Sequence, residues 1–536
     1  MRLPMISRRR LLVIALCFAW VLPGLVAHDP WKPDEAYTFG IVYEMLRGGS
    51  WIASKLAGEP FLKEPPLYYL TAAASGVLFS PLLPLHDAVR LATGAWALVA
   101  LLFCGLAARE LNGPGYGALG IALLIGCFGL VIRSHQIVPQ VAGVAGFAMA
   151  YYGCVRALRG PMVGGLWLGT GLGVVFLSQG IPEAITVALI ALTLPFVSST
   201  WRTREYAVAL GIACIAAAPW LTVWPLLLHT YSPELFHEWL RSETAARLYG
   251  RAGTGLYYLR ILPWYAWPLW PLALWAIWRA FGNGPAKPGI TLPLAGFVIT
   301  LLALTEATDK RELYALPLLV PLALLAAPGT VSLRRGAANA WYWFAVMGFT
   351  FFMLVGWVYW SGLELGIPPR LHAHLHRIQP GYTPGFHWLP FVIALAYCAG
   401  WVAVLVRMKK SPQRPAFVWA AGVTVIWAML ATLFIGWVDT GKSYRGMIRS
   451  MQAALPASYD CMASRDLAEP QRAMLHYFAG IVTYREESPA RRHDCELMLV
   501  QGVAQEERPP AGSWQKIWEG TRPGDKVERY RLYRRL

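Results

Sequence analysis

The chain has 536 residues, of which 56% are hydrophobic and only 14% are charged. Soluble domains carry about a quarter charged residues, so an ordinary soluble enzyme, a disordered chain and a small disulfide scaffold are excluded. The formal charge of +17 fits a membrane protein whose cytoplasmic loops concentrate Lys and Arg, and no basic-aromatic module indicates binding to nucleic acid. The composition therefore predicts a polytopic membrane protein in contact with membrane lipid.

Thirteen apolar runs, each close to the length that crosses a bilayer, follow one another up to residue 437. They lie at 11–27, 88–107, 116–132, 141–157, 162–177, 183–198, 206–228, 260–278, 289–304, 313–328, 340–361, 388–406 and 416–437. The first run follows three arginines and resembles a signal peptide. No small-residue cleavage site ends it, so we expect an uncleaved anchor.

Charge alternates from loop to loop along these runs. One set of loops is basic and nearly free of acids, and it holds residues 8–10, Arg109, Arg156, Arg159, Arg202, Arg204, Arg279, Lys287, Arg334, Arg335, Arg407, Lys409 and Lys410. The positive-inside rule places this set and the N-terminus in the cytoplasm, and the odd number of spans then places the C-terminus outside, in the periplasm or at the cell exterior. We therefore expect a multi-pass membrane protein.

The opposite loops include a long first outer loop, 28–87, and they carry nearly all acids of the membrane part. A proton- or ion-coupled transporter keeps some acids near the bilayer midplane. This distribution favours an enzyme at the outer surface, with a transporter as the alternative. A nucleotide-sugar donor would need a cytoplasmic catalytic domain, and the predicted cytoplasmic loops are too short for one.

The segment 438–536 has the hydropathy of a soluble domain. Helical patterns at 444–455 and 469–478 alternate with extended runs at 459–463, 496–501, 515–518 and 529–533. The expected fold class is thus an α-helical polytopic membrane protein (1–437) with a small α/β extracytoplasmic domain (438–536). Cys461 and Cys495 are the two cysteines of that domain, and an oxidising compartment favours a disulfide between them.

The first outer loop contains a helix start, in which Pro33 precedes Asp34 and Glu35. Acids in a first helical turn complement the helix dipole, so these two are either structural or catalytic. The later motif 58–69 reads GEPFLKEPPLYY. Its prolines favour an extended Glu64, and if Lys63 is extended as well, the two side chains point to opposite sides. The motif is either a rigid elbow or a ligand site.

An acidic pair that opens the first outer loop, followed by G-x-x-x-x-x-E-P-P-L-Y-Y, resembles the GT-C class of bacterial lipid-linked-sugar glycosyltransferases. The most similar group is that of the aminoarabinose (lipid A) transferases and protein O-mannosyltransferases. The similarity continues through 165–180 (GLWLGTGLGVVFLSQG), 264–270 (WYAWPLW) and 309–317 (DKRELYALP). The resemblance implies transfer of a sugar from a polyprenyl-phosphate donor to an acceptor at the outer leaflet.

In this resemblance Asp34 matches the family's first-loop acid, which serves the acceptor or a divalent metal, and Glu35 accompanies it. The sequence departs from the family at three places. Lys63 and Glu64 reverse the order Glu-Lys that many relatives have, Gln140 stands where an Asp is frequent, and Gln179 stands where a Lys is common. These departures allow a divergent acceptor or weakened activity.

A departing polyprenyl phosphate needs cations where negative charge develops. The candidate donor- and phosphate-binding residues on the outer side are Lys63, Glu64, Arg133, His135, Lys310, Arg311 and Tyr314. Each cation also has a structural interpretation, as a cap of a span or a member of a surface pair.

Asp34 is the expected general base for an acceptor hydroxyl, with Glu35 beside it. With a phosphate acceptor, Asp34 would instead position the acceptor or bind a divalent metal. One clear acid indicates a single displacement with inversion. The expected acceptor is a lipid or an envelope glycan; protein hydroxyls, and a flippase for a lipid-linked sugar, are the alternatives.

Overall fold

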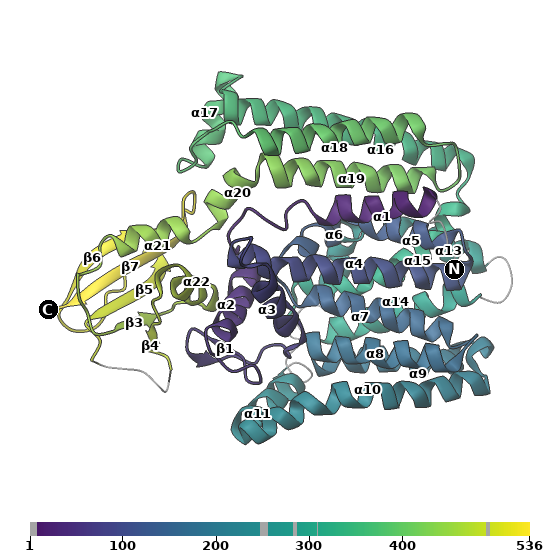
Figure 1. Cartoon of the computed structure of the whole chain (residues 1–536), viewed down its shortest axis with the longest axis horizontal. Coiled ribbons are helices and arrows are strands. Elements are labelled where there is room, and N and C mark those ends of the chain that lie inside the picture. Colours follow the sequence, from purple (N-terminus) through teal and green to yellow (C-terminus); the bar gives the residue numbers. More distant parts are fainter. Residues whose placement is uncertain (1–7, 247–255, 282–286, 308, 489–493) are drawn as a thin grey trace.

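The computed structural model describes residues 8–246, 256–281, 287–307, 309–488 and 494–536. A bundle of long helices fills one part of the molecule, and a small sheet domain projects beyond one end of the bundle (Figure 1). The expected fold class, a helical polytopic membrane protein with a small α/β C-terminal domain, is confirmed. Residues 247–255, which lie between the predicted runs 206–228 and 260–278, are outside the described residues.

Each of the thirteen predicted runs contains helix. The bundle consists of α1 (Arg8–Val21), α4 (Leu85–Asn112), α5 (Tyr116–Ile125), α6 (Phe128–Val131), α7 (Gln140–Arg156), α8 (Pro161–Gln179), α9 (Ile181–Val197), α10 (Arg204–Tyr231), α12 (Tyr257–Tyr265), α13 (Leu269–Phe281), α14 (Pro288–Glu306), α15 (Leu319–Val331), α16 (Arg335–Trp360), α18 (Trp388–Arg407) and α19 (Arg414–Leu433). Short 3-10 or π turns lie at Arg133–His135 (η1), Ser199–Trp201 (η2), Ser242–Ala246 (η3), Glu312–Leu318 (η4) and Ser361–Leu365 (η5).

The number of spans differs from the expectation of thirteen. Within the described residues, eight helices are long and apolar enough to cross a membrane, or nine if a bent pair counts as one span. That pair is α5 with the segment Phe128–His135, and the two parts are bent by 72°. Broken or short helices of this kind occupy several predicted runs, so the count of thirteen is not confirmed.

Small residues let the inner helices approach closely. A Cβ on Gly153 of α7 would lie 2.4 Å from the backbone nitrogen of Leu168 in α8, and one on Gly169 would lie 2.4 Å from the carbonyl oxygen of Ala213 in α10. Such contacts are typical of membrane helices, whose association depends on van der Waals packing. The outer helices α16 and α18 instead leave most of their apolar side chains exposed, as lipid-facing helices do.

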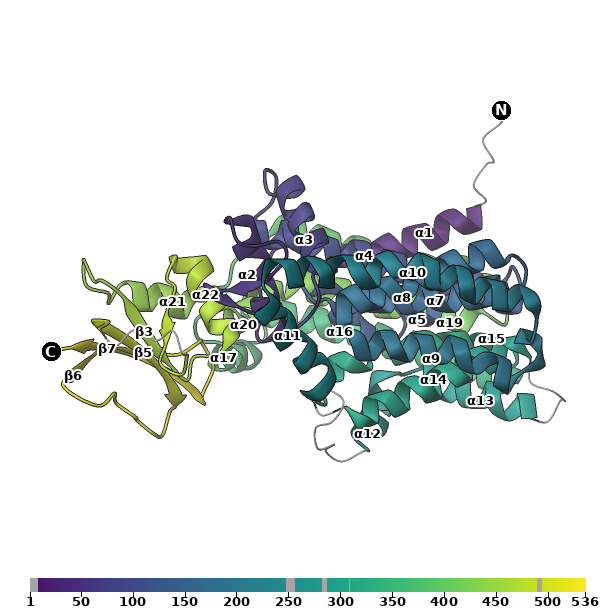
Figure 2. The same ribbon diagram turned by 90° about the horizontal axis from the view of Figure 1, so that it is seen from below.

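The remaining helices and a short hairpin lie at or beyond the end of the bundle that carries the sheet domain (Figures 1 and 2). They are α2 (Asp34–Leu46), β1 (Lys55–Leu56), β2 (Glu59–Pro60), α3 (Leu67–Phe79), α11 (Pro233–Arg241), α17 (Pro369–Ile378), α20 (Ile435–Lys442), α21 (Arg445–Gln452) and α22 (Glu469–Ala479). The helix predicted after Pro33 is confirmed, since α2 begins at Asp34 and has both acids in its first turn.

The C-terminal sheet has the strand order β4-β3-β5-β7-β6, with β3 parallel to β4 and β5 and the other pairs antiparallel. The strands are β3 (Met462–Arg465), β4 (Tyr484–Arg485), β5 (Leu497–Val503), β6 (Trp514–Gly520) and β7 (Glu528–Arg535). The four predicted strands and two predicted helices are confirmed, and the two-residue β4 is additional. The expected disulfide between Cys461 and Cys495 is also confirmed.

The first outer loop and the C-terminal domain share one apolar core. It contains Phe39, Ile41 and Val42 of α2 together with Met447 and Met474 of the C-terminal helices. Helices α2 and α22 lie side by side (Figures 1 and 2), and a Cβ added to Gly40 would lie only 2.5 Å from the Cβ of Ala473. The sheet domain is therefore docked on the first outer loop and is not merely tethered to it.

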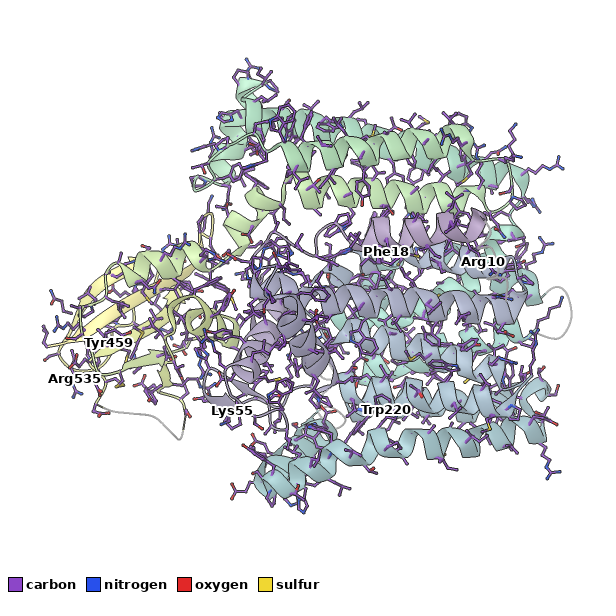
Figure 3. All side chains as sticks on the ribbon, viewed as in Figure 1. Arg10, Phe18, Lys55, Trp220, Tyr459 and Arg535 are labelled. Carbon is purple, nitrogen blue, oxygen red and sulfur yellow. A yellow bond between two sulfur atoms is a disulfide. The ribbon has the colours of Figure 1, made fainter. Side chains whose placement is uncertain are left out.

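The two ends of the described chain lie at opposite ends of the molecule. Figure 3 places Arg10 at the bundle end that lies away from the sheet domain, and Arg535 at the outer end of that domain. The predicted outer loops and the C-terminal domain thus lie together, away from the basic N-terminal helix.

Candidate active site

Asp34 lies at the start of α2 and is 3% exposed. The guanidinium of Arg311 donates a hydrogen bond to its Oδ1, and Nη1 of Arg133 lies 3.6 Å from its Oδ2. Both arginines are partly exposed. The structure therefore brings together the predicted acid and two of the predicted phosphate-binding cations, which come from three separate parts of the sequence.

Glu35, although adjacent in sequence, points into a different environment. Its carboxylate accepts a hydrogen bond from Nε of Arg90 at 2.6 Å and from the backbone N–H groups of Trp31 and Ile137 at 3.1 and 3.2 Å. The side chains of Glu35 and Arg90 are completely buried. A buried carboxylate of this kind needs a cation and full hydrogen bonding. Its contacts anchor α2 to α4, and they do not place Glu35 beside Asp34 as a catalytic companion.

Lys63 and Glu64 make different contacts, although both lie near Tyr37. Nζ of Lys63 lies 4.9 Å from the ring centroid of Tyr37. Glu64 is buried and accepts a hydrogen bond from the hydroxyl of Tyr69 at 2.8 Å. Tyr37 follows Asp34 by one helical turn, and its burial together with the nearby carboxylates of Glu64 and Asp34 holds its pKa well above the usual value. The Tyr37 hydroxyl thus stays protonated between the two acids.

The three departures from the family pattern are neighbours in space. Nε2 of Gln140 lies 3.5 Å from Oε1 of Glu64, and Nε2 of Gln179 donates to the carbonyl oxygen of Gln140 at 3.3 Å. A carboxylate at position 140 would repel the buried Glu64, whereas an amide donates to it. An acid at 64 and amides at 140 and 179 therefore form one connected polar cluster.

His135 does not join these residues. Its imidazole is buried between the rings of Trp20 and Trp427, at centroid distances of 5.3 and 4.6 Å, and its nitrogens face the carbonyl oxygens of Trp20 and Val131. The predicted phosphate-binding role thus finds no support in its position, and the structure gives it a packing role. No signal in the sequence distinguishes a buried imidazole of this kind from an exposed one.

A cavity of about 520 Å³ adjoins this cluster through Lys63 and Tyr314, whereas Asp34, Arg133 and Arg311 do not line it. It is lined by the β2 segment, the facing ends of α8, α9 and α14, helix α11 and the turn at Tyr314. Lys63, Gln179 and Tyr314 are the site candidates among its lining residues. The Tyr314 hydroxyl donates to Asp309 at 3.4 Å, and Lys310 lies half-buried between Asp309 and Arg311. The volume is typical of small-ligand sites and accommodates a sugar with a phosphate group.

The sequence analysis did not identify two residues that shape the site, Tyr37 and Arg90. Tyr37 lies close to Asp34, Glu64 and Tyr314 and contacts Lys63, and its spacing of three from Asp34 on a helix was the available signal. Arg90 was signalled by being the one charged residue inside the predicted run 88–107.

The described residues do not support a metal at Asp34. Both carboxylate oxygens of Asp34 face guanidinium groups, which a divalent cation would have to displace. Among the parts of the chain that the structure describes, the close group of potential ligands is Cys461, Asp494 and Cys495, and its cysteines are joined in the disulfide. A metal at Asp34 therefore does not fit, and we derive no step through one.

No family model matches the chain. The undecaprenyl phosphate-alpha-4-amino-4-deoxy-L-arabinose arabinosyl transferase of Pseudomonas savastanoi pv. phaseolicola is 28% identical over 341 residues, which cover 62% of this chain and 62% of that relative, less than two thirds of its length. The enzyme of the same name from Serratia proteamaculans is 24% identical over 438 residues, covering 78% of this chain and 75% of the relative.

Solved structures agree with these relatives. ArnT from Cupriavidus metallidurans bound to undecaprenyl phosphate superimposes with a TM-score of 0.71 and 15% identity, covering 97% of each chain. Its apo form gives a TM-score of 0.69. The resemblance inferred from the first outer loop is confirmed: the chain is a sequence relative of the aminoarabinose arabinosyl transferases and has the fold of ArnT.

Proposed function

We propose that the protein transfers a sugar from an undecaprenyl-phosphate-linked donor to a lipid or envelope-glycan acceptor at the outer face of the bacterial inner membrane. The contact of Asp34 with Arg311 and Arg133 beside the cavity carries this proposal. The relatives are named as arabinosyl transferases that use undecaprenyl phosphate, and the ArnT structure binds that lipid. Aminoarabinose on undecaprenyl phosphate and lipid A are therefore the first donor and acceptor to test.

The arrangement supports a single displacement at the sugar. The acceptor oxygen bonds to the anomeric carbon, the bond from that carbon to the phosphate oxygen breaks, and the acceptor proton passes to Asp34. Arg311 and Arg133 stabilise the negative charge on the departing phosphate. A single displacement of this kind inverts the configuration at the anomeric carbon.

Donor binding also prepares the base in this proposal. Without donor, Arg311 and Arg133 face the carboxylate of Asp34. Phosphate oxygens compete for the same guanidinium groups, and guanidinium–phosphate pairs are strong and directional. The donor phosphate would thus draw the arginines away and release Asp34 to accept a proton.

The other predicted site residues have supporting roles in this proposal. Lys63, Tyr314 and Gln179 line the cavity and would contact the sugar or its phosphate, with Lys310 beside Arg311, while Tyr37 contacts Lys63 and Glu64 is bonded to Tyr69. The division into 1–437 and 438–536, with a cytoplasmic N-terminus and a periplasmic C-terminal domain, is part of the proposal. It is supported by the opposite placement of Arg10 and Arg535 (Figure 3).

The test is the variant Asp34→Asn, with Glu110→Gln as a control at the other end of the bundle. Loss of a general base lowers rates about 10²–10⁴-fold, so we expect Asp34→Asn to abolish sugar addition, measured by mass spectrometry of envelope lipids, glycans and proteins. Binding of undecaprenyl phosphate and thermal stability should remain. Normal sugar addition by Asp34→Asn would overturn the site, and sugar found only on proteins would overturn the acceptor class.

A further inference from the structure

A polar contact joins the C-terminal segment to the chain just before Asp34. The carboxylate of Asp29, five positions before Asp34, accepts hydrogen bonds from Oγ of Ser443 at 2.6 Å and from Nε of Arg445 at 2.8 Å. Asp439 in turn accepts from the backbone N–H of Asp29 at 2.9 Å and from Nε1 of Trp31 at 2.8 Å. We call this group, Asp29, Trp31, Asp439, Ser443 and Arg445, the Asp29 latch.

The same stretch of backbone is held from the membrane side. Nη2 of Arg90 donates to the carbonyl oxygens of His28 at 3.0 Å and Asp29 at 3.5 Å. The backbone of residue 29 is therefore fixed between the bundle and the C-terminal domain. Pro30 and Pro33 restrict the five-residue path from there to Asp34, so a displacement of Asp29 is transmitted to α2 and is not absorbed by a flexible loop.

Further contacts repeat this connection at other points of the first outer loop. Lys32 pairs with Glu528 of β7 at 2.8 Å. Glu59 pairs with Arg472 of α22 at 3.1 Å, and residues of α2 and α22 share the apolar core. The C-terminal domain thus contacts the chain on both sides of the segment that presents Asp34.

We propose that the C-terminal domain positions the transfer site, with Arg445 and Ser443 holding Asp29 and so fixing Asp34 relative to Arg311 and Arg133. The inference rests on the proposed function of Asp34. Arg445 and Ser443 contact Asp29 and lie outside the cavity lining, so they are positioning residues. A displacement of about 1 Å at a reacting group lowers turnover by up to about 100-fold while leaving binding of the substrate largely intact.

The test compares Arg445→Ala, Arg445→Lys and the control Arg508→Ala in the full-length purified protein. Arg508 pairs with Glu506 on the exposed surface of the same domain, away from the first outer loop. The donor is aminoarabinose linked to undecaprenyl phosphate, and the acceptor is lipid A. The measured quantities are kcat, the KM for the donor and the binding of undecaprenyl phosphate. We expect Arg445→Ala to lower kcat about 10- to 100-fold with KM and lipid binding unchanged, Arg445→Lys to recover most of kcat, and Arg508→Ala to behave as wild type.

A purely structural latch predicts a different result, namely a lower yield or thermal stability with a normal kcat in the folded fraction. That outcome would overturn the proposal. If Arg445→Ala does not fold, the milder Ser443→Ala decides, since it removes the hydroxyl bond to Asp29 and the bond from the backbone N–H of Arg445 but keeps the guanidinium. We expect kcat to fall about threefold to tenfold, and a wild-type kcat would refute the inference.

Asp34→Asn in the same assay separates the two proposals. No transfer by the wild-type protein refutes the proposed function itself, and full transfer by Asp34→Asn refutes Asp34 as the base. An inactive Asp34→Asn together with wild-type kcat in Arg445→Ala leaves the function standing and refutes the positioning role alone.

Discussion

The buried ion cluster around Arg90 predicts that removing one charge lowers the free energy of unfolding much more than removing a pair of opposite charges does. The guanidinium donates to Glu35 and to Asp87 at 2.6 Å each, and all three side chains are buried. Replacing Arg90 by Met leaves two carboxylates without their cation. Breaking a buried pair in this way costs about 3–5 kcal/mol, so Arg90→Met should lower the free energy of unfolding by about that amount.

The double variant Arg90→Met/Glu35→Gln removes the pair together. The amide oxygen introduced at position 35 can keep accepting from one of the backbone N–H groups of Trp31 and Ile137, and Asp87 keeps its bond from the N–H of Ala27 at 2.9 Å. The double variant should therefore be more stable than Arg90→Met alone, with a coupling of about 1–3 kcal/mol.

The assay is denaturant unfolding of the purified protein in detergent, followed by tryptophan fluorescence. Arg159→Met is the control, because its pair with Glu110 is largely exposed and such pairs contribute at most about 1 kcal/mol. A loss below about 1 kcal/mol in Arg90→Met, or equal losses in the single and double variants, would contradict the argument that Arg90 neutralises buried charge.

Three further predictions concern the C-terminal domain. Gly40→Ala should destabilise the protein by about 1–3 kcal/mol in thermal unfolding, because the new Cβ would lie 2.5 Å from that of Ala473. Burial and the neighbouring Asp29 raise the pKa of Asp439 to about 6. The stability that protonated Asp439 contributes is therefore fully present below the ordinary pKa of the group and is lost as pH rises through 6. Relative to wild type, Asp439→Asn should gain up to about 3 kcal/mol in the free energy of unfolding between about pH 4 and 7. A pH-independent difference would refute this. Opening the disulfide by Cys461→Ser/Cys495→Ser should cost about 3–4 kcal/mol, given the 34-residue separation of the two cysteines, measured against reduced wild type as the matched control.

Features that depend on local pattern were predictable from the sequence. The start of α2 at Asp34 follows from Pro33 and two acids, and the C-terminal strands follow from short extended runs between helical patterns. The position of each bundle helix follows from its apolar run. Bends such as that between α5 and α6 were not predictable, because an apolar run carries no sign of where its helix breaks.

Pairings between distant segments are what the sequence could not provide. Asp34 was predicted as an acid and Arg311 as a cation, but their 277-residue separation conceals that they meet. Glu35 looks equivalent to Asp34 on a helix, and only the position of Arg90 shows that the two carboxylates face different environments. Likewise, the hydropathy change near residue 438 indicated a soluble domain but gave no sign that this domain packs on the first outer loop. The apolar faces of α2 and α22 belong to one core.

The core shared by the first outer loop and the C-terminal helices also sets an order of events during synthesis. Residues 36–45 leave the ribosome early, but their packing partners at 447–475 emerge roughly 400 residues later. The first outer loop can therefore complete its apolar core only after the bundle helices have been synthesised, so a chain that stops before residue 447 leaves the apolar face of α2 without its packing partners.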